Sequence, residues 1–346
     1  MKKYLGVSYF SCKMPEHFEK DIIEMKDNGM NEILLTFSEN DMQFYSGTYK
    51  IFVEICHKYK FRVYFGSWGV GGIFGGEAYS KYASVYYENR QILSNGERPP
   101  FACMNNPHFR RFFIEWIKTA IECGADYLFF DEPHFFIPSW SVHFRASNED
   151  AWGCRCKYCQ KKYFELYGEP MPKIETDKVR KMKKDSIFDF IKFACEEAKK
   201  IKKEIKTSVC LITDEDFLHS DIPIRLAKET KLDELGTDPY WLPYGKEESY
   251  KIEEYLNKEF KTACEVLKKV EKETGKEIHL WIKNFNIKKG TEKFVGRAIE
   301  IANDIGINNI LAWSYKGTKY MSSIACDDPN KVWKILTEKY KKIRNV

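Results

Sequence analysis

The chain alternates short β-rich runs with longer amphipathic segments, and this alternation constrains its fold more than any other feature of the sequence. We identify eight cycles in 346 residues, about 43 residues each. Strict alternation of this kind requires parallel strands joined by right-handed crossovers, and eight such units favour closure into a barrel. The predicted strands lie at 4–10, 32–37, 62–67, 127–131, 207–213, 236–240, 278–283 and 309–314.

The segments between these strands have the features of helices that pack against a sheet. Apolar residues recur at helical spacing in 109–120 and 294–302, which gives each segment one apolar face. Asn106 and Asp328 each precede a proline, a pattern typical of a helix N-terminus. We therefore predict an α/β fold, a single (β/α)8 TIM barrel over residues 1–346, with an open doubly wound sheet as the alternative.

Two predicted connections are too long to be simple turns. One runs over 69–105 after the third strand, and the other over 133–185 after the fourth. Both follow the carboxyl ends of strands, where barrels of this kind build their active sites. We expect the substrate to bind there, with 133–185 forming a loop insertion in the barrel.

Composition narrows the class of protein. Hydrophobic residues make up 43% and aromatic residues 16% of the chain, which excludes a disordered protein. The net charge of +5 is small and gives little support to nucleic-acid binding. Because no run approaches the roughly 18 to 20 apolar residues of a membrane helix and no signal peptide is evident, we expect a cytoplasmic protein without membrane contact. A homo-oligomer remains open.

Four of the eleven cysteines form a distinct group. Cys154, Cys156 and Cys159 have the spacing C-x-C-x-x-C, and Cys103 lies near the end of the other long loop. In a reducing compartment we expect no disulfides, and four thiolates would make a closed tetrahedral zinc site. Such a site leaves no position for a catalytic water, so the zinc would be structural. Coincidental free cysteines are the alternative.

Carboxylates follow several predicted strands. Asp131 and Glu132 lie at the end of the fourth predicted strand, and Asp238 lies at the end of the sixth. Asp214 begins an acidic run after the fifth strand. Since a strand alternates faces, Asp131 and Glu132 cannot both point straight inward. Hydrolysis of a glycosidic bond requires two carboxyl groups, one protonated and one ionised, which these residues can supply. A solvated turn is an equally good interpretation for Asp214.

Aromatic and polar residues surround these acids in the predicted barrel. Sugar rings stack their C–H faces on aromatic rings, while their hydroxyl groups require charged or amide partners. The joint placement therefore indicates a carbohydrate substrate. The aromatic residues near strand ends are Tyr9, Trp68, Tyr240, Trp241, Trp281, Trp313 and Tyr315, and the candidate polar partners are His134, Asp214, Lys283 and Asn284.

The region around the cysteines resembles the zinc loop of the family 42 β-galactosidases, which are barrel glycoside hydrolases. In that family a cysteine before the third helix joins a C-x-C-x-x-C cluster after strand four to bind zinc, and here Cys103 precedes Asn106 and Arg110 in the matching stretch. The resemblance covers about residues 100–170. It implies a zinc-bound loop and, because Asp131-Glu132-Pro133 matches the Asn-Glu-Pro signature of the wider clan, a general acid/base at Glu132.

The chain departs from that family after the seventh strand. The clan places its nucleophilic glutamate there, but residues 280–285 contain no carboxylate. Other barrel glycosidases carry an aspartate nucleophile at the end of strand four and an acid on strand six, and that pattern would assign Asp131 and Asp238. The chain thus resembles an outlying family of glycoside hydrolases.

The sequence leads to one main hypothesis and two alternatives. The main hypothesis is a glycoside hydrolase acting on a glycoside or short oligosaccharide, in which Glu132 protonates the leaving oxygen and Asp131 or Asp238 is its partner. The first alternative is a sugar-binding barrel that has lost hydrolysis. The second is a lyase or isomerase that uses Lys283, although we expect this lysine to pair with Asp131 or Asp238.

Overall fold

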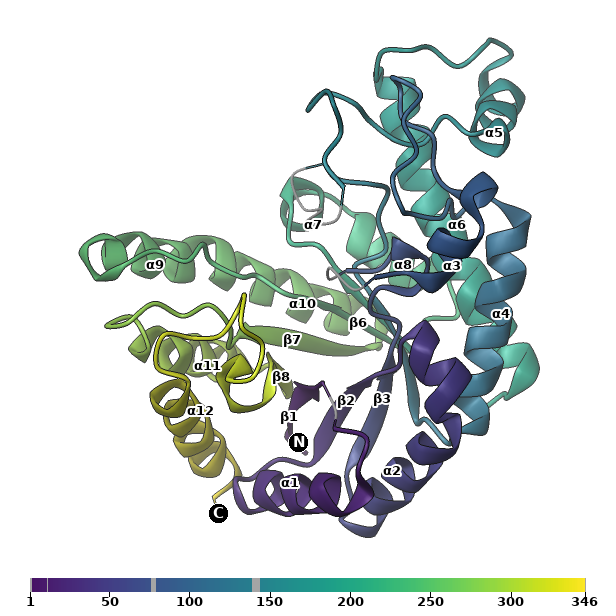
Figure 1. Cartoon of the computed structure of the whole chain (residues 1–346). Helices are drawn as coiled ribbons and strands as arrows, with labels where there is room; N and C mark the ends of the chain where they lie inside the picture. Colours follow the sequence, from purple (N-terminus) through teal and green to yellow (C-terminus); the bar gives the residue numbers. More distant parts are fainter. Residues whose placement is uncertain (1, 11, 76–78, 139–143, 346) are drawn as a thin grey trace.

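Eight parallel strands close into a barrel in the computed structural model, which describes residues 2–10, 12–75, 79–138 and 144–345 (Figure 1). Each strand pairs with the next, and β8 pairs with β1. The predicted (β/α)8 barrel is thereby confirmed. The strands are β1 (Tyr4–Tyr9), β2 (Glu32–Thr36), β3 (Arg62–Gly66), β4 (Tyr127–Asp131), β5 (Lys206–Leu211), β6 (Glu234–Thr237), β7 (Glu277–Lys283) and β8 (Asn309–Trp313).

Helices cover the outside of the barrel because each buries one apolar face against the strands (Figure 1). In α4, for example, Phe109, Phe113 and Trp116 are buried, and Asn106 caps the helix as expected. None of the helices in the described ranges is both long and apolar enough to cross a lipid bilayer. The helices are α1 (Pro15–Asp27), α2 (Ser46–Lys58), α3 (Lys81–Val85), α4 (Pro107–Glu122), α5 (Lys157–Tyr167), α6 (Asp177–Ile201), α7 (Glu215–His219), α8 (Ile222–Glu229), α9 (Ser249–Tyr255), α10 (Lys261–Thr274), α11 (Lys293–Ile305) and α12 (Pro329–Arg344).

Two predicted boundaries differ from the structure. The sixth strand spans Glu234–Thr237 and not 236–240, so Asp238 lies just beyond its end. The segment after β4 does contain a separate helix, α5, which projects away from the barrel in Figure 1. The next helix, α6, begins at Asp177, inside the predicted insertion 133–185.

The strand register sets which side chains share a level inside the barrel, since alternate strands contribute to each level. Near the carboxyl ends of the strands, the register places Thr36, Asp131, Asp238 and Trp313 at one level, which we call the barrel mouth. Below the mouth, apolar side chains fill the interior, including Leu34, Phe129, Trp281 and Leu311. The barrel interior below the mouth is therefore a packed core and not an open channel.

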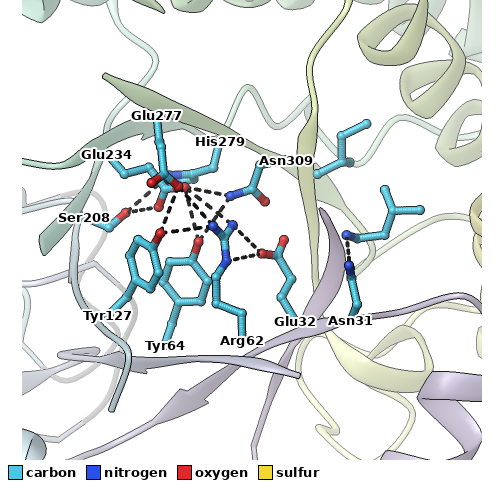
Figure 2. A network of polar contacts seen from close by, with 12 residues as sticks. Asn31, Glu32, Arg62, Tyr64, Tyr127, Ser208, Glu234, Glu277, His279 and Asn309 are labelled. Atoms are coloured by element: carbon cyan, nitrogen blue, oxygen red, sulfur yellow. Dashed lines mark hydrogen bonds and ion pairs between the residues drawn. The ribbon is translucent and has the colours of Figure 1, made fainter. Parts of the chain in front are cut away.

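At the opposite end of the barrel lies a network of charged side chains, buried except for Glu277, which we call the barrel floor (Figure 2). Arg62 is 2.7 Å from Glu32 and 3.0 Å from Glu277. Glu234 accepts hydrogen bonds from Ser208 and Asn309, each at 2.7 Å, and lies 3.3 Å from His279. Every carboxylate of the floor thus has a basic partner.

Candidate active site

Three carboxyl groups meet at the barrel mouth. Asp131 ends β4 with its side chain facing the barrel interior, and Asp238 follows β6 at the same level. Glu132 has a φ of 42°, a left-handed conformation that non-glycine residues rarely adopt. This turn ends the alternation of the strand, and the side chain of Glu132 comes within hydrogen-bonding distance of Asp238. Two consecutive acids can therefore serve one site.

The environment of these acids favours their protonated forms. Burial, and then the charge of Glu132, hold the pKa of Asp131 well above its usual range. Burial and the neighbouring charge of Glu132 also hold the pKa of Asp238 well above its usual range, and burial raises the pKa of Glu132. Within the described ranges, none of the ion pairs between side chains involves these three acids. The cluster can therefore keep a proton to a higher pH than isolated carboxyl groups would, and this proton is available for donation.

The loop after β3 covers Glu132. The backbone N–H of Gly75 donates a hydrogen bond to the carbonyl oxygen of Asp131. A Cβ atom added to Gly75 would lie 2.9 Å from the Cβ of Glu132, closer than real Cβ contacts. Only glycine allows this approach, so the backbone of the β3 loop lies directly against the acid.

A continuous chain of aromatic rings lines the mouth beside the acids. Each ring meets the next edge to face, with centroids 4.7 to 5.1 Å apart. All five rings are partly exposed, so they can contact a ligand. We call this chain the aromatic arc; it runs through Trp68, Phe10, Trp313, Phe285 and Tyr240.

The arc includes three of the predicted substrate-binding residues and two that the sequence analysis missed. Trp68, Tyr240 and Trp313 were predicted, whereas Phe10 and Phe285 were not. Phe10 directly follows β1 and continues its inward-facing alternation, and this pattern could have identified it. The indole N–H groups of Trp68 and Trp281 are buried without a hydrogen-bond partner in the described structure, and they are donors available to a hydroxylated ligand.

Lys283 has a different partner from the one expected. Its ammonium group donates a hydrogen bond to the backbone carbonyl of Trp241 and lies 5.2 Å from the ring of Phe285. Trp241 itself is 3% exposed and packs in the outer core. Burial lowers the pKa of Lys283 to about 8. The lysine therefore holds the loop after β6 and pairs with neither Asp131 nor Asp238.

Two predicted residues belong to the scaffold and not to the mouth. The hydroxyl group of Tyr315 donates to Asp21 at 2.8 Å and to Glu24 at 3.0 Å, both on α1. Its ring also packs against Tyr9, so both tyrosines lie in the helical layer. Asn284 is fully buried and donates to the carbonyl of Ser314. These hydrogen bonds hold Tyr315 and Asn284 in the scaffold, so neither is placed with the acids.

His134 and Asp214 lie beside the mouth. His134 is 7% exposed, its Nδ1 is 2.7 Å from the carbonyl oxygen of Phe135, and burial lowers its pKa. Asp214 is exposed and caps α7 by accepting a hydrogen bond from the N–H of Phe217 at 2.9 Å. The capping role matches the solvated-turn interpretation of Asp214.

The four predicted cysteines come together as a buried cluster. Their sulfur atoms all lie within 4.8 Å of one another, and those of Cys103 and Cys159 are 3.4 Å apart. Cys156 is the N-cap residue of α5, and Cys159 lies in its first turn. Four sulfurs bound to one Zn²⁺ at about 2.3 Å would be roughly 3.8 Å apart, so the donor set fits a tetrahedral metal site.

The cluster joins the two long loops. Cys103 comes from the segment after β3, and the other three cysteines come from the segment after β4. Backbone hydrogen bonds connect the same segments, from Ser94 to Trp152 at 2.9 Å and from Arg155 to Ile92 at 2.6 Å. A bound metal would therefore fix the loops that surround Glu132.

No protein-family model matches this chain, and no curated protein matches it by sequence. Solved structures do match. A β-galactosidase from Halorubrum lacusprofundi has a TM-score of 0.71 at 11% identity, over 99% of this chain and 58% of that one. The family 42 β-galactosidase Gan42B from G. stearothermophilus has a TM-score of 0.66 at 10% identity, over 99% and 56%.

The catalytic domain of a β-amylase from Paenibacillus polymyxa matches with a TM-score of 0.61 at 10% identity, over 98% of both chains. The chain thus has the barrel fold of glycoside hydrolases, and the resemblance expected from the sequence is confirmed at the level of the fold. The chain spans a little over half the length of the β-galactosidases it matches.

Proposed function

We propose that this chain is a glycoside hydrolase that uses the carboxyl groups of the barrel mouth for acid/base catalysis. The observation that carries the proposal is the meeting of Asp131, Glu132 and Asp238 with raised pKa values and without basic partners in the described structure. The aromatic arc beside them supports a carbohydrate substrate, because sugar rings stack on partly exposed aromatic faces. The shared fold agrees with this class of activity.

The contacts suggest a role for each acid. Glu132 acts as the general acid/base, and Asp238 lies close enough to Glu132 to share its proton. The second carboxylate of a glycosidase lies on the other side of the anomeric carbon, about 5 Å or more from the acid. Since Asp238 touches Glu132, Asp131 is the better candidate for that nucleophile or base.

The test is a set of isosteric variants assayed on the methyl glycosides of the sugars that the wild type cleaves fastest from 4-nitrophenol, because an alcohol, unlike 4-nitrophenol, needs a proton in order to leave. Glu132→Gln should lower kcat by about 10²- to 10⁴-fold, the usual contribution of a general acid. Glu115→Gln, an exposed position on α4, is the matched control and should keep full activity. Full activity in a folded Glu132→Gln variant would refute the assignment.

We also propose that the metal of the cysteine cluster is a structural Zn²⁺. Four thiolates fill a tetrahedral zinc site, so the ion would stabilise the loops and take no part in the reaction. All eleven cysteines are free thiols, which agrees with a cytoplasmic location.

Lys283 supports a second candidate function, a lyase or isomerase reaction. Its pKa of about 8 leaves roughly a tenth of the amine unprotonated at pH 7, and a free amine can form a Schiff base with a carbonyl substrate. Borohydride trapping with such a substrate tests this role, and an untrapped lysine would count against it. A sugar-binding barrel without hydrolysis would instead show oligosaccharide binding by calorimetry with no bond cleavage.

A further inference from the structure

A cavity of about 570 Å³ lies beside the candidate active site, between the loops that follow β4 and β5. Glu132 and Pro133 form part of its inner wall, and α6, α7 and α8 supply the outer wall. Its volume falls in the range of small-molecule sites. Because Glu132 lines the cavity and also touches Asp238 of the mouth, the acid stands between two compartments.

The inner surface of the cavity is apolar. Phe135, Ile191, Phe217 and Leu226 are each at most 3% exposed, and Ile187 lies partly exposed on the same face of α6. The aromatic arc of the mouth does not extend into this cavity. The two sides of Glu132 therefore differ. The mouth offers the partly exposed ring faces of the aromatic arc, which suit a sugar, and the cavity offers aliphatic and phenyl groups.

Charged side chains surround the cavity, but each of its five basic residues already has an acidic partner. An anionic ligand would have to compete with these ion pairs, so the basic residues do not favour an anion. The pairs are Arg180 with Asp177 at 2.5 Å, Lys181 with Asp185 at 2.8 Å, Lys183 with Glu175 at 2.7 Å, Lys184 with Asp216 at 2.6 Å and Arg225 with Asp185 at 3.8 Å.

We propose that this cavity receives the leaving group of the substrate, and that this group is an uncharged, largely apolar alcohol or phenol. The inference rests on the proposed glycosidase function. As the glycosidic C–O bond breaks, Glu132 gives its proton to the departing oxygen, and the neutral alcohol lies in the cavity. Water then supplies the hydroxyl group of the sugar product and returns a proton to Glu132. The substrate class is thus a glycoside of an apolar aglycone and not an oligosaccharide.

The first experiment compares the methyl and hexyl glycosides of whichever sugar the chain cleaves fastest from 4-nitrophenol. Each buried methylene strengthens binding about fourfold, so kcat/KM for the hexyl glycoside should be at least about tenfold higher. Ile187→Asn should reduce this ratio toward one. Ile201→Asn, on the exposed end of the same helix, is the matched control and should keep the ratio. Equal kcat/KM values in the wild type, or an unchanged ratio in Ile187→Asn, would overturn the inference.

The second experiment measures binding without turnover. Calorimetry should detect binding of 2-naphthol to the wild type and to Ile201→Asn, with affinity at least about fivefold weaker in Ile187→Asn. If no glycoside is cleaved but this pattern holds, the proposed hydrolysis fails while the apolar ligand site stands. If glycosides are cleaved but 2-naphthol binds all three proteins equally or none of them, the cavity assignment fails while the hydrolase stands.

Discussion

The floor and the mouth of the barrel each gather three carboxyl groups, but the two sets have different partners. On the floor, Arg62 and His279 accompany the acids, and Ser208 adds a hydrogen bond to Glu234 (Figure 2). Although burial acts in the other direction, His279, Arg62 and Ser208 lower the pKa of Glu234 to about 2. At the mouth, the acids face mainly one another and rings. The difference separates acids that are paired with basic side chains from acids that are not, and the unpaired set is the one we propose as catalytic.

The largest expected effect comes from removing the cation of the floor. Arg62→Met leaves Glu32, which is fully buried, without its partner, and breaking such a pair costs about 3–5 kcal/mol. Urea unfolding measures the loss. Glu132→Gln is the contrasting variant and should preserve or raise the free energy of unfolding, because it removes repulsion. An equal loss of unfolding free energy in both variants would contradict the difference that we draw between floor and mouth.

The pH dependence of stability should have opposite signs for Glu234 of the floor and for the acids of the mouth. Glu32, the other fully buried acid of the floor, is like the mouth acids in this respect, because burial raises its pKa to about 7 even beside Arg62. The depressed pKa of Glu234 contributes stability above about pH 4.5 that is lost as the pH falls toward 2. The advantage of the wild type over Glu234→Gln should therefore shrink by about 3 kcal/mol across that window.

The raised pKa values of Asp131 and Asp238 act the other way, since stability is lost as the pH rises through them. The double variant Asp131→Asn/Asp238→Asn should gain on the wild type as the pH rises above 4. Unfolding curves at a series of pH values check both trends. A constant difference between these proteins at all pH values would contradict the raised pKa values.

The cysteine cluster offers another test of the comparison, because a metal ion bound there would stabilise the loops around the mouth and not the floor. Metal analysis should find one zinc per chain in the wild type and none in Cys156→Ser. We expect that variant to lose about 1–2 kcal/mol, a few degrees in thermal midpoint, together with activity. Hydrogen exchange of the β-strand amides near the floor should not change. Cys12→Ser, at an exposed thiol outside the cluster, is the control and should retain the metal.

The smallest effect distinguishes two neighbouring aromatic residues at the end of β8. Tyr315→Phe removes hydrogen bonds to Asp21 and Glu24, so it should cost about 1 kcal/mol of stability and leave kcat/KM within about twofold. Trp313→Leu breaks the aromatic arc and should raise KM. Reversal of these outcomes would place Tyr315 back in the substrate site.

The fold was largely predictable from the sequence, because the alternation of β-rich runs with amphipathic segments is a local signal. The exception is β6, whose first residue is the buried Glu234. A glutamate does not indicate a buried strand by itself. Its burial depends on contacts with Tyr64, His279 and Asn309, which lie far away in the sequence.

The site was predictable only in part. The sequence placed the candidate acids at strand ends and the cysteines in loops. In the structure the acids Asp131, Glu132 and Asp238 come together at the mouth, and the four cysteines come together in a separate cluster. The hydrogen bond from Lys283 to a backbone carbonyl was not predictable, since no residue type marks it. The cavity beside Glu132 was also invisible in the sequence, because it forms where α6, α7 and α8 meet.

The peptide backbone that lies against Glu132 offers a position at which the environment of this acid can be changed. Gly75 carries no side chain, so the space above the acid is set by the course of a loop that the cysteine cluster ties down. Adding even one methyl group at position 75 would push directly on Glu132, the residue that we propose as the proton donor. A change in pH optimum could thus arise from a single mutation that alters no ionisable residue. Homologues with another residue at this position should therefore differ in the pH at which they work best.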